Sequence, residues 1–518
     1  MNYKKRTIWL IIIATLIRCI TAGSIELGND EVYYRLYAQH LQWNYFDHPP
    51  MVGWLIRLTT FNLFADNEFF IRLGAIIAAA GSTWFLFLSG KKLQDERTGF
   101  LAAFIYTCTI YGSIIAGTFI LPDSPQMLCW TAGLYLLIGI TANKTIDKTA
   151  KNKLLLFGLV AGIGMLCKIH TVFLWLAFLL YIIFYNRQWW KTWALYAAGI
   201  ISLLLFYPVI QWNIDNHFVT YLYHSNRVTV TDSGFNINSF LTFATGQFFY
   251  YNPVIFVLMI PAVMAAFSNK LSVSNAHKRL LLLGALPLIL LATAIAFFRD
   301  VLPHWTGPGY CGLVLLTACY FSRKNVSAAK SPSLPRPLIF AAALITTITI
   351  AGIFVVDLLP GRLGKKDKEV YGEGDFTLDM YGWKGFKKIF SEIAQQDVKN
   401  GVMKRDAVIV CNKWFPAAHI DQYIAMPLKK DVVAIGDTND IHQYAWINSE
   451  RKKLQPGDDA YCIVPSNYPV DVKAVYKDHF AVIDNPVIIE QKRNGSTCRY
   501  FSIWRLHNYL LKQNPPAY

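Results

Sequence analysis

Charged side chains are scarce in this 518-residue chain, where they make up 16% of the residues, against about 25% in average soluble domains. The shortage lies mainly before residue 357, where long apolar runs follow one another. This pattern excludes an ordinary soluble protein over most of the chain. It predicts a polytopic α-helical membrane protein that ends in a soluble tail.

Metal-binding cysteine patterns are also missing. None of the nine cysteines forms a CxxC pair or a Cys/His spacing typical of a metal site, and several lie inside apolar runs, where a thiol behaves as a small hydrophobe. Cys411, Cys462 and Cys498 lie in the tail, so a disulfide there would leave one thiol over. The tail has no glycine-rich phosphate loop either, which argues against an independent enzyme in it.

The formal net charge of +16 raises the question of nucleic-acid binding. Lys and Arg, however, lie largely in short loops between apolar runs, where they orient a membrane protein. If the spans alternate, every cytoplasmic loop is net basic, as the positive-inside rule requires. We therefore interpret the basic charge as a topology signal.

The first apolar run, Ile8 to Ile25, follows Lys4-Lys5-Arg6 and is too long for a cleaved signal. We expect it to be a retained span whose basic end is cytoplasmic. Further runs long enough to cross a membrane occur near 69–90, 98–117, 125–142, 154–168, 171–186, 192–212, 239–267, 280–298, 308–322 and 338–357. This makes about eleven spans, and an odd number places the tail on the side opposite the cytoplasmic N-terminus. If the short run 154–168 does not cross the membrane, the tail lies in the cytoplasm instead.

The first outer loop, 26–67, concentrates ionisable residues at the membrane edge, where they are costly. Asn29 or Asp30 can cap a helix whose tyrosines and leucines have helical spacing, and aromatic residues of this kind prefer the membrane interface. A second amphipathic segment, Met51 to Phe64, follows the diproline. Two helices on the outer surface are predicted, with Asp47 and His48 at the bend between them.

Four short motifs occur along the membrane part, each of them once. They are Asp30-Glu31 after the first span, Tyr45-Phe46-x-x-Pro49-Pro50, Ile71-Arg72-Leu73, and Leu121-Pro122-Asp123-Ser124-Pro125. Together, over about residues 5–325, they resemble membrane glycosyltransferases of the GT-C fold. The likeness is strongest to the superfamily of protein O-mannosyltransferases, such as dolichyl-phosphate-mannose-protein mannosyltransferases, and bacterial aminoarabinose and related polyprenyl-phosphate sugar transferases.

The resemblance implies transfer of a sugar from a polyprenyl-phosphate donor on the extracytoplasmic face, with inversion. It places the catalytic carboxylate at Asp30, with Glu31 beside it as a substrate contact. The chemistry agrees, because polyprenyl phosphate is a workable leaving group, so that one base and cations around the phosphate suffice. A single displacement needs no carboxylate nucleophile. The structural alternative for Asp30 is a helix cap.

The resemblance also suggests substrate contacts in three later turns. Arg72 would contact phosphate, although arginines near a span end often snorkel to the interface. Lys168 lies where a lipid phosphate would lie, or else anchors the interface. Asp123 would belong to the site, or else cap the next helix.

His48 departs from the family pattern. Aminoarabinose-type transferases tend to have a lysine before the two prolines, whereas histidine is only partly charged at neutral pH. The fallback role of His48 is a neutral hydrogen bond to phosphate or sugar, next to Asp47. Later, His304 and Trp305 could close over the donor, or anchor the interface. The polar 213–238 loop shows no motif and receives no assigned role.

We divide the chain into a transmembrane catalytic domain, 1–357, and an extracytoplasmic α/β domain, 358–518. In the tail, strand-like runs near 407–411, 432–435 and 461–464 alternate with helical stretches such as 417–426. Asn494-Gly495 separates two further runs as a hairpin turn. Acceptor recognition or packing over the site is the expected role of the tail.

The expected function is a glycosyltransferase of the bacterial cytoplasmic membrane. Its partners would be a polyprenyl-phosphate-linked sugar, a lipid, glycan or protein acceptor, and the bilayer. The carboxylates could hold a divalent cation, although no ligand spacing demands one. The alternative is a transporter or flippase of lipid-linked sugars, but such proteins place polar sites near the bilayer midplane between repeated halves, and no repeat is detectable here.

Overall fold

A computed structural model of the chain describes residues 2–142, 145–231, 234–323, 334–361 and 363–510. Two compact units are distinguished. The transmembrane unit comprises residues 1–22 and 41–349, and the sheet unit comprises residues 23–40 and 350–518. The predicted boundary at residue 357 stays a prediction.

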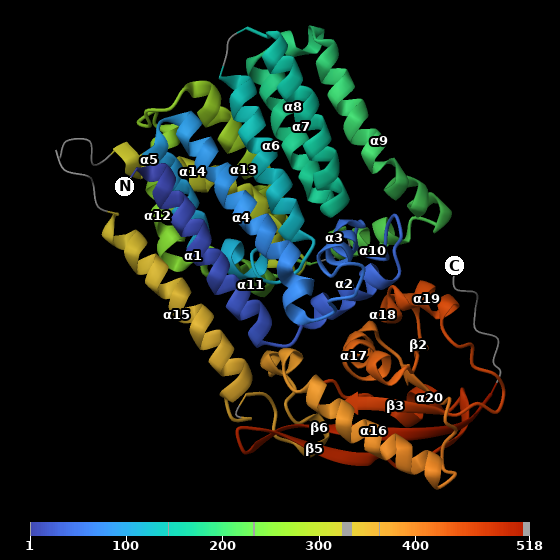
Figure 1. The fold of residues 1–518 in the computed structure, drawn as a ribbon. Helices are drawn as coiled ribbons and strands as arrows, with labels where there is room; N and C mark the ends of the chain where they lie inside the picture. Colours follow the sequence, from blue (N-terminus) through green and yellow to red (C-terminus); the bar gives the residue numbers. More distant parts are fainter. Residues whose placement is uncertain (1, 143–144, 232–233, 324–333, 362, 511–518) are drawn as a thin grey trace. The chain divides into compact units, whose positions relative to one another are not determined.

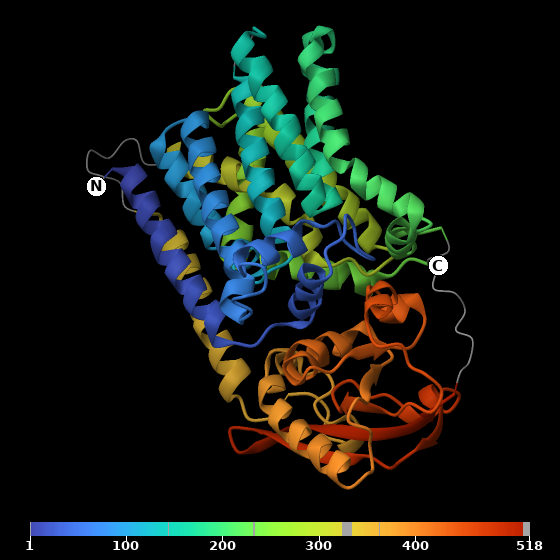
Figure 2. The same cartoon turned by 45° about the vertical axis from the view of Figure 1, so that its right-hand side comes forward.

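Helices make up the described part of the transmembrane unit (Figures 1 and 2). They are α1 (Tyr3–Ser24), α3 (Met51–Thr59), α4 (Glu68–Leu93), α5 (Glu96–Thr107), α6 (Asp123–Thr141), α7 (Lys148–Cys167), α8 (Val172–Tyr185), α9 (Trp193–Asp215), α10 (Val219–Val228), α11 (Ile237–Tyr250), α12 (Pro253–Phe267), α13 (Asn275–Ala296), α14 (Tyr310–Arg323) and α15 (Arg336–Leu358). In Figure 1, α6, α7, α8 and α9 run side by side.

Among the described residues, six helices are long and apolar enough to cross a membrane, or seven if a bent pair counts as one span. The six are α1, α4, α7, α9, α13 and α15. The chain is therefore a multi-pass membrane protein. The count of eleven spans stays a prediction, although a helix occurs in each of the predicted ranges.

The range 239–267, predicted as one span, consists of two helices. α11 and α12 meet at an angle of 95°, because Asn252 has a positive φ of 59° and Pro253 follows it. The buried Asn252 amide donates to the carbonyls of Cys108, at 2.9 Å, and Ala341, at 3.0 Å. These two bonds attach the break to the end of α5 and to α15.

The sheet unit contains a six-stranded mixed sheet of order β2-β1-β3-β6-β4, with β5 also paired to β6. The strands are β1 (Val408–Cys411), β2 (Val432–Ala434), β3 (Ala460–Pro465), β4 (Phe480–Ile483), β5 (Val487–Arg493) and β6 (Ser496–Tyr509). β1 pairs in parallel with β2 and β3, whereas β6 runs antiparallel to its neighbours. The predicted hairpin is confirmed, because Asn494 and Gly495 both have positive φ, as a type I′ turn requires.

Helices complete the sheet unit: α2 (Asn29–Gln39), α16 (Trp383–Lys399), α17 (Trp414–Ile420), α18 (Thr438–Ile441), α19 (Tyr444–Ile447) and α20 (Val472–Tyr476). α16 lies along the sheet in Figure 1. Its Phe386 stacks on Phe501 with ring centroids 3.9 Å apart. Val410, Cys462 and Tyr476 belong to the core that α20 helps to cover.

α2 corrects two predictions about the first loop. The helix begins at Asn29, but its N-cap is Gly28, whose N–H donates to the Glu31 carboxylate at 2.9 Å. The expected capping by Asn29 or Asp30 is therefore wrong. Tyr33, predicted at a membrane interface, is buried with its ring 4.8 Å from that of Trp414, and its hydroxyl accepts from the Gln443 N–H.

A fully buried ion pair joins the end of β5 to the segment before α16. Arg493 donates to the Asp375 carboxylate at 2.9 Å, and both side chains are 0% exposed. The same guanidinium donates to the Thr377 hydroxyl and to the Val356 carbonyl. Each charge is thus paired and hydrogen-bonded, which is the condition for burying it.

We expect Arg493→Met to lower the free energy of unfolding of the sheet unit by about 3–5 kcal/mol, because Asp375 would be left buried without its cation. Thermal denaturation of the detergent-solubilised full chain, read by limited proteolysis, measures the change. Lys492→Met is the matched control, since that lysine is 57% exposed. Equal melting of the two variants would contradict the assignment.

Candidate functional site

Segments that are distant in sequence bring ionisable side chains together in the transmembrane unit. The loop before α3, the start of α6, the turn after α7, helix α10 and the turn before α14 contribute to it. We call this set the polar cluster; its members are Asp47, His48, Asp123, Lys168, His170, His224, Arg227, His304 and Trp305. Six of the nine predicted site residues belong to it.

The centre of the polar cluster is an ion pair between Asp123 and Lys168. The Lys168 ammonium lies 2.8 Å from Asp123 Oδ2, and the side chains are only 5% and 2% exposed. Tyr111, in a π-helical turn (Tyr111–Ile115), donates its hydroxyl to Asp123 Oδ1 at 3.0 Å. Both carboxylate oxygens of Asp123 are therefore engaged by side chains rather than by a helix cap.

The local backbone explains why these two charges meet. Asp123 is the first residue of α6, directly after Pro122, which cannot continue a preceding helix. Lys168 ends α7 in an extended conformation and begins the turn that leads to a short 3-10 helix (Ile169–Thr171). The two helix ends thus present a carboxylate and an ammonium to each other.

Asp47 and His48 face helix α10 through several polar contacts. The His224 Nε2 donates to the Asp47 carbonyl at 2.7 Å, and the rings of His48 and His224 lie 5.9 Å apart. The Asp47 carboxylate is 3.9 Å from His48 Nε2, longer than a hydrogen bond. Asn44 donates to the Thr220 hydroxyl, which holds the loop on α10.

His304 and Trp305 lie in a 3-10 helix (Pro303–Gly309) that α11 holds in place. The Gln247 amide donates to the Pro303 carbonyl at 2.9 Å and accepts from the Thr306 hydroxyl at 2.6 Å. The Trp305 ring has the Arg227 guanidinium 5.6 Å from its centroid and the His170 ring at 5.9 Å. An indole with a cation on its face is thereby fixed at the cluster.

Burial decides the charge of the histidines. Desolvation lowers the pKa of His304 to about 4, helped by Lys168 and Arg227. Desolvation also lowers the pKa of His48 well below its usual value, with His224 and Lys168 adding to the effect. Both rings are therefore neutral at pH 7 and act as hydrogen-bond donors, while Lys168 and Arg227 carry the positive charge.

Arg72 lies inside α4 and is fully buried. Its Nη1 donates to the Ala22 carbonyl at 2.9 Å, and its guanidinium lies 5.5 Å from the Phe119 ring centroid. The side chain thus helps to fix the end of α1 and does not snorkel to the surface. Its predicted contact with phosphate stays a prediction.

Asp30 and Glu31 belong to the sheet unit, at the start of α2. Asp30 is exposed, whereas the buried Glu31 folds back on the Gly28 N–H. Glu31 therefore has a structural role as part of the helix cap. The catalytic role of Asp30 and the substrate contact of Glu31 stay predictions.

A hydrogen-bonded network that the sequence reading missed fixes the start of α2. The Asn29 amide donates to Asp379 Oδ2 at 3.0 Å, and its oxygen faces the His419 Nε2 at 3.1 Å. Tyr468 donates to the other Asp379 oxygen at 2.9 Å. Burial lowers the pKa of His419 well below its usual value. Because the Asn29 side-chain oxygen can only accept, the His419 Nε2 is the donor in this contact. Asn29 is thus bonded on both sides, one residue before Asp30.

The polar cluster contains residues that sequence reasoning did not single out. His224 and Arg227 come from the loop to which no role was assigned, and His170 lies two residues after Lys168. The signal available was the polar density of the 213–238 loop. Among the described residues, no group of three or more His, Cys, Asp or Glu is arranged to hold a metal ion, so the expectation about a divalent cation stays untested.

Comparison with solved structures identifies the fold. ArnT from Cupriavidus metallidurans matches in the apo state with a TM-score of 0.63 at 12% identity, over 97% of this chain and 98% of that one. The same protein bound to undecaprenyl phosphate matches with a TM-score of 0.63 at 13% identity, over 96% and 97%. The chain has the GT-C fold of ArnT.

Sequence comparison agrees. Residues 47–212 match the family model described as dolichyl-phosphate-mannose-protein mannosyltransferase. Lipid A galacturonosyltransferase RgtD from Rhizobium johnstonii is 21% identical over 311 residues, which are 60% of this chain and 62% of that protein's length. The family model covers about a third of the chain, and the likeness to RgtD extends over 311 residues, so the chain is similar to glycosyltransferases in sequence as well as in fold. The matched family segment begins at Asp47 and includes Asp123 and Lys168, but not Asp30.

We expect Lys168→Met to lower the free energy of unfolding of the transmembrane unit by about 3–5 kcal/mol, because Asp123 would be buried without its cation. The double variant Lys168→Met/Asp123→Asn should recover most of this loss. Thermal denaturation in detergent measures both, with Lys91→Met at an exposed pair as the control. A double variant no more stable than the single one would argue against the ion pair.

A second prediction concerns Asp379, whose pKa burial raises to about 6 from the ordinary value of 3.8. The folded state therefore binds a proton more tightly than the unfolded state, so this group stabilises the fold at low pH and loses that contribution as the pH rises through 6. The asparagine in Asp379→Asn does not titrate. The free energy of unfolding of this variant, relative to that of wild type, should therefore increase by about 1–3 kcal/mol as the pH rises from 4 to 7.5.

Melting temperatures of wild type and Asp379→Asn at several pH values test this sign. The exposed Asp440→Asn serves as the control and should follow wild type at every pH. A difference between wild type and Asp379→Asn that stays constant, or shrinks, as the pH rises would contradict the prediction.

Proposed function

We propose that the chain is a glycosyltransferase that moves a sugar from a polyprenyl-phosphate donor to an acceptor, in the glycosylation of a cell-envelope glycan, lipid or protein. The supporting observation is the polar cluster, which groups the buried Lys168 with Arg227 and neutral histidines in a unit with the fold of ArnT. ArnT has been solved with undecaprenyl phosphate bound. The relative RgtD is described as a lipid A galacturonosyltransferase.

The polar cluster has the chemistry needed to receive the phosphate of such a donor. Lys168 and Arg227 supply positive charge, and His48 and His304 supply neutral N–H donors. Asp123 balances the charge of Lys168 while no anion is present. An arriving phosphate would be held by charge-assisted hydrogen bonds from groups that are already in place.

The proposed reaction is a single displacement. The acceptor oxygen forms a bond to the anomeric carbon, and the bond from that carbon to the phosphate oxygen breaks. Polyprenyl phosphate leaves as an anion that Lys168 and Arg227 stabilise, the acceptor proton passes to a carboxylate, and the configuration inverts. We assign the base to Asp30 from the resemblance. Asp47, within the polar cluster, is the alternative base.

The proposed location is the cytoplasmic membrane of a bacterium, with the sheet unit on the extracytoplasmic side. This placement follows from the donor class and from the alternation of basic loops. No cofactor is required by the proposed chemistry, because the cations of the polar cluster take the part that a metal ion would play at the phosphate.

We expect Asp30→Asn to reduce release of free polyprenyl phosphate by at least about 100-fold, because general-base catalysis contributes on that scale. Purified wild type and variant are given a panel of polyprenyl-phosphate sugars with a crude envelope extract as acceptor. The exposed Asp367→Asn is the matched control and should release at the wild-type rate.

Asp47→Asn in the same assay distinguishes the two carboxylates. If Asp47→Asn abolishes release while Asp30→Asn retains it, Asp47 is the base. Movement of the lipid-linked sugar across a membrane by wild type, with no release of polyprenyl phosphate from any donor, would replace the transferase by the flippase alternative.

A further inference from the structure

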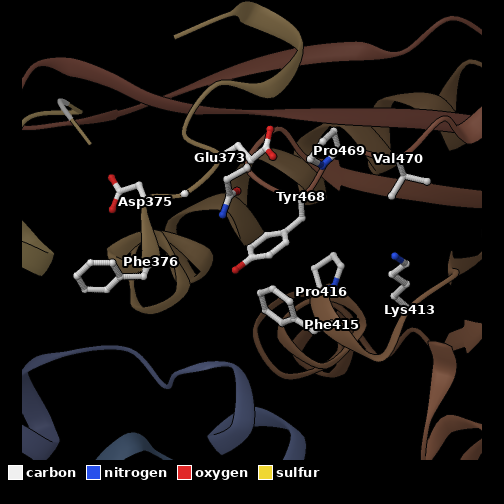
Figure 3. A pocket seen from close by; sticks show the side chains of 11 residues that line it. Glu373, Asp375, Phe376, Lys413, Phe415, Pro416, Tyr468, Pro469 and Val470 are labelled. Atoms are coloured by element: carbon white, nitrogen blue, oxygen red, sulfur yellow. The ribbon is translucent and has the colours of Figure 1, made fainter. Parts of the chain in front are cut away.

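The sheet unit contains a cavity of its own, distant in sequence from the polar cluster. Its volume is about 390 Å³, within the range of about 300–1,000 Å³ that small-molecule sites occupy. Three segments of the sheet unit line it: residues 373–376, residues 413, 415 and 416 at the start of α17, and residues 467–470 after β3 (Figure 3).

Aromatic rings form part of the wall. Phe415 and Tyr468 meet edge to face, with ring centroids 4.4 Å apart and planes at 89°. The Tyr468 hydroxyl donates to Asp379 at 2.9 Å, and this bond holds the ring in the wall. Phe376 also lines the cavity and is 68% exposed. Phenylalanine rings usually stabilise a protein by being buried, so this ring is available to contact a ligand.

A buried polar atom in the same wall has no partner. Asn467 lines the cavity and is only 4% exposed, yet its side-chain oxygen makes no hydrogen bond to any described residue. Leaving a buried acceptor unsatisfied costs about 1–3 kcal/mol. The Asn467 amide therefore has unused capacity to accept a hydrogen bond beside the cavity, of the kind that a hydroxyl or an N–H of a ligand could fill.

Charged groups of both signs complete the lining. Lys413 is exposed and presents three N–H donors. Glu373 lies 2.8 Å from Lys365 and offers carboxylate oxygens as acceptors. Both are labelled at the cavity in Figure 3. The cavity thus combines ring faces with donors and acceptors, rather than being uniformly apolar or of a single charge.

We propose that this cavity binds a pyranose ring of a glycan acceptor. A pyranose has C–H faces that pack on aromatic rings, which matches Phe376. Its hydroxyls donate and accept hydrogen bonds, which matches Asn467, Lys413 and Glu373. An acyl chain would leave the Asn467 oxygen unpaired. The binding of a sugar rests on the cavity alone, whereas the role of that sugar as acceptor rests on the proposed function.

The test uses the full-length protein in nanodiscs prepared without sugar-headed detergent. Methyl glycosides of glucose, galactose, mannose and N-acetylglucosamine are titrated by saturation-transfer difference NMR, with cyclohexylmethanol as the ring that lacks the hydroxyls. The pocket variants are Phe376→Ala and Asn467→Ala. Matched controls are Ile488→Ala and Lys477→Ala, which are exposed on the same unit and do not line the cavity.

We expect at least one glycoside to bind saturably and more tightly than cyclohexylmethanol, with affinity reduced tenfold or more in both pocket variants and unchanged in both controls. Because Phe376 is exposed, its substitution tests the cavity without disturbing the core. Absence of saturable binding to wild type, equal binding of cyclohexylmethanol, or wild-type binding by Phe376→Ala would each overturn the proposal.

Release of polyprenyl phosphate is measured separately on the same preparations. Glycoside binding that the pocket variants lose, with no release by wild type from any donor, keeps the sugar site and overturns its role as an acceptor site together with the proposed function. Release without glycoside binding overturns the sugar site alone. The two failures are therefore distinguishable.

Discussion

The buried ion pair between Lys168 and Asp123 is the constraint on which the transmembrane unit depends. In a low-dielectric interior, each charge is tolerable only because the other lies 2.8 Å away and Tyr111 satisfies the remaining oxygen. The pair joins the start of α6 to the end of α7 and to a π-helical turn. The same burial keeps His48 and His304 neutral, so the site holds donors without accumulating charge.

Several members of the polar cluster were named from the sequence through the family resemblance, and local signals mark the helix ends that carry them. A proline next to Asp123 and a basic residue in the short turn at Lys168 each mark a helix end, and the apolar runs give the helices between them. The strands of the tail and its Asn494-Gly495 hairpin were equally readable, since pattern and turn chemistry determine them. The GT-C fold was recognised from short motifs and agrees with the match to ArnT.

Contacts between segments that are distant in sequence could not be predicted from the sequence. The bend at Asn252 depends on carbonyls of Cys108 and Ala341, which no local pattern announces. Arg227 reaches Trp305 from a loop without a motif. The tyrosine stripe of α2 has the composition of an interfacial helix, but tertiary packing against Trp414 decides its surroundings. Glu31 was read as a ligand contact, although its position three residues after Gly28 is that of a capping box.

The division of the first loop between the two units affects how the protein can be taken apart. Tyr33 and Leu36 of α2 are buried, and Tyr33 contacts Trp414 and Gln443, which lie 381 and 410 residues later in the chain. No single cut separates the units, because a fragment ending before residue 350 keeps α2 but loses these partners. Such a fragment would expose apolar side chains to water and tend to aggregate. Exchange of the sheet unit between relatives therefore has to carry residues 23–40 with it.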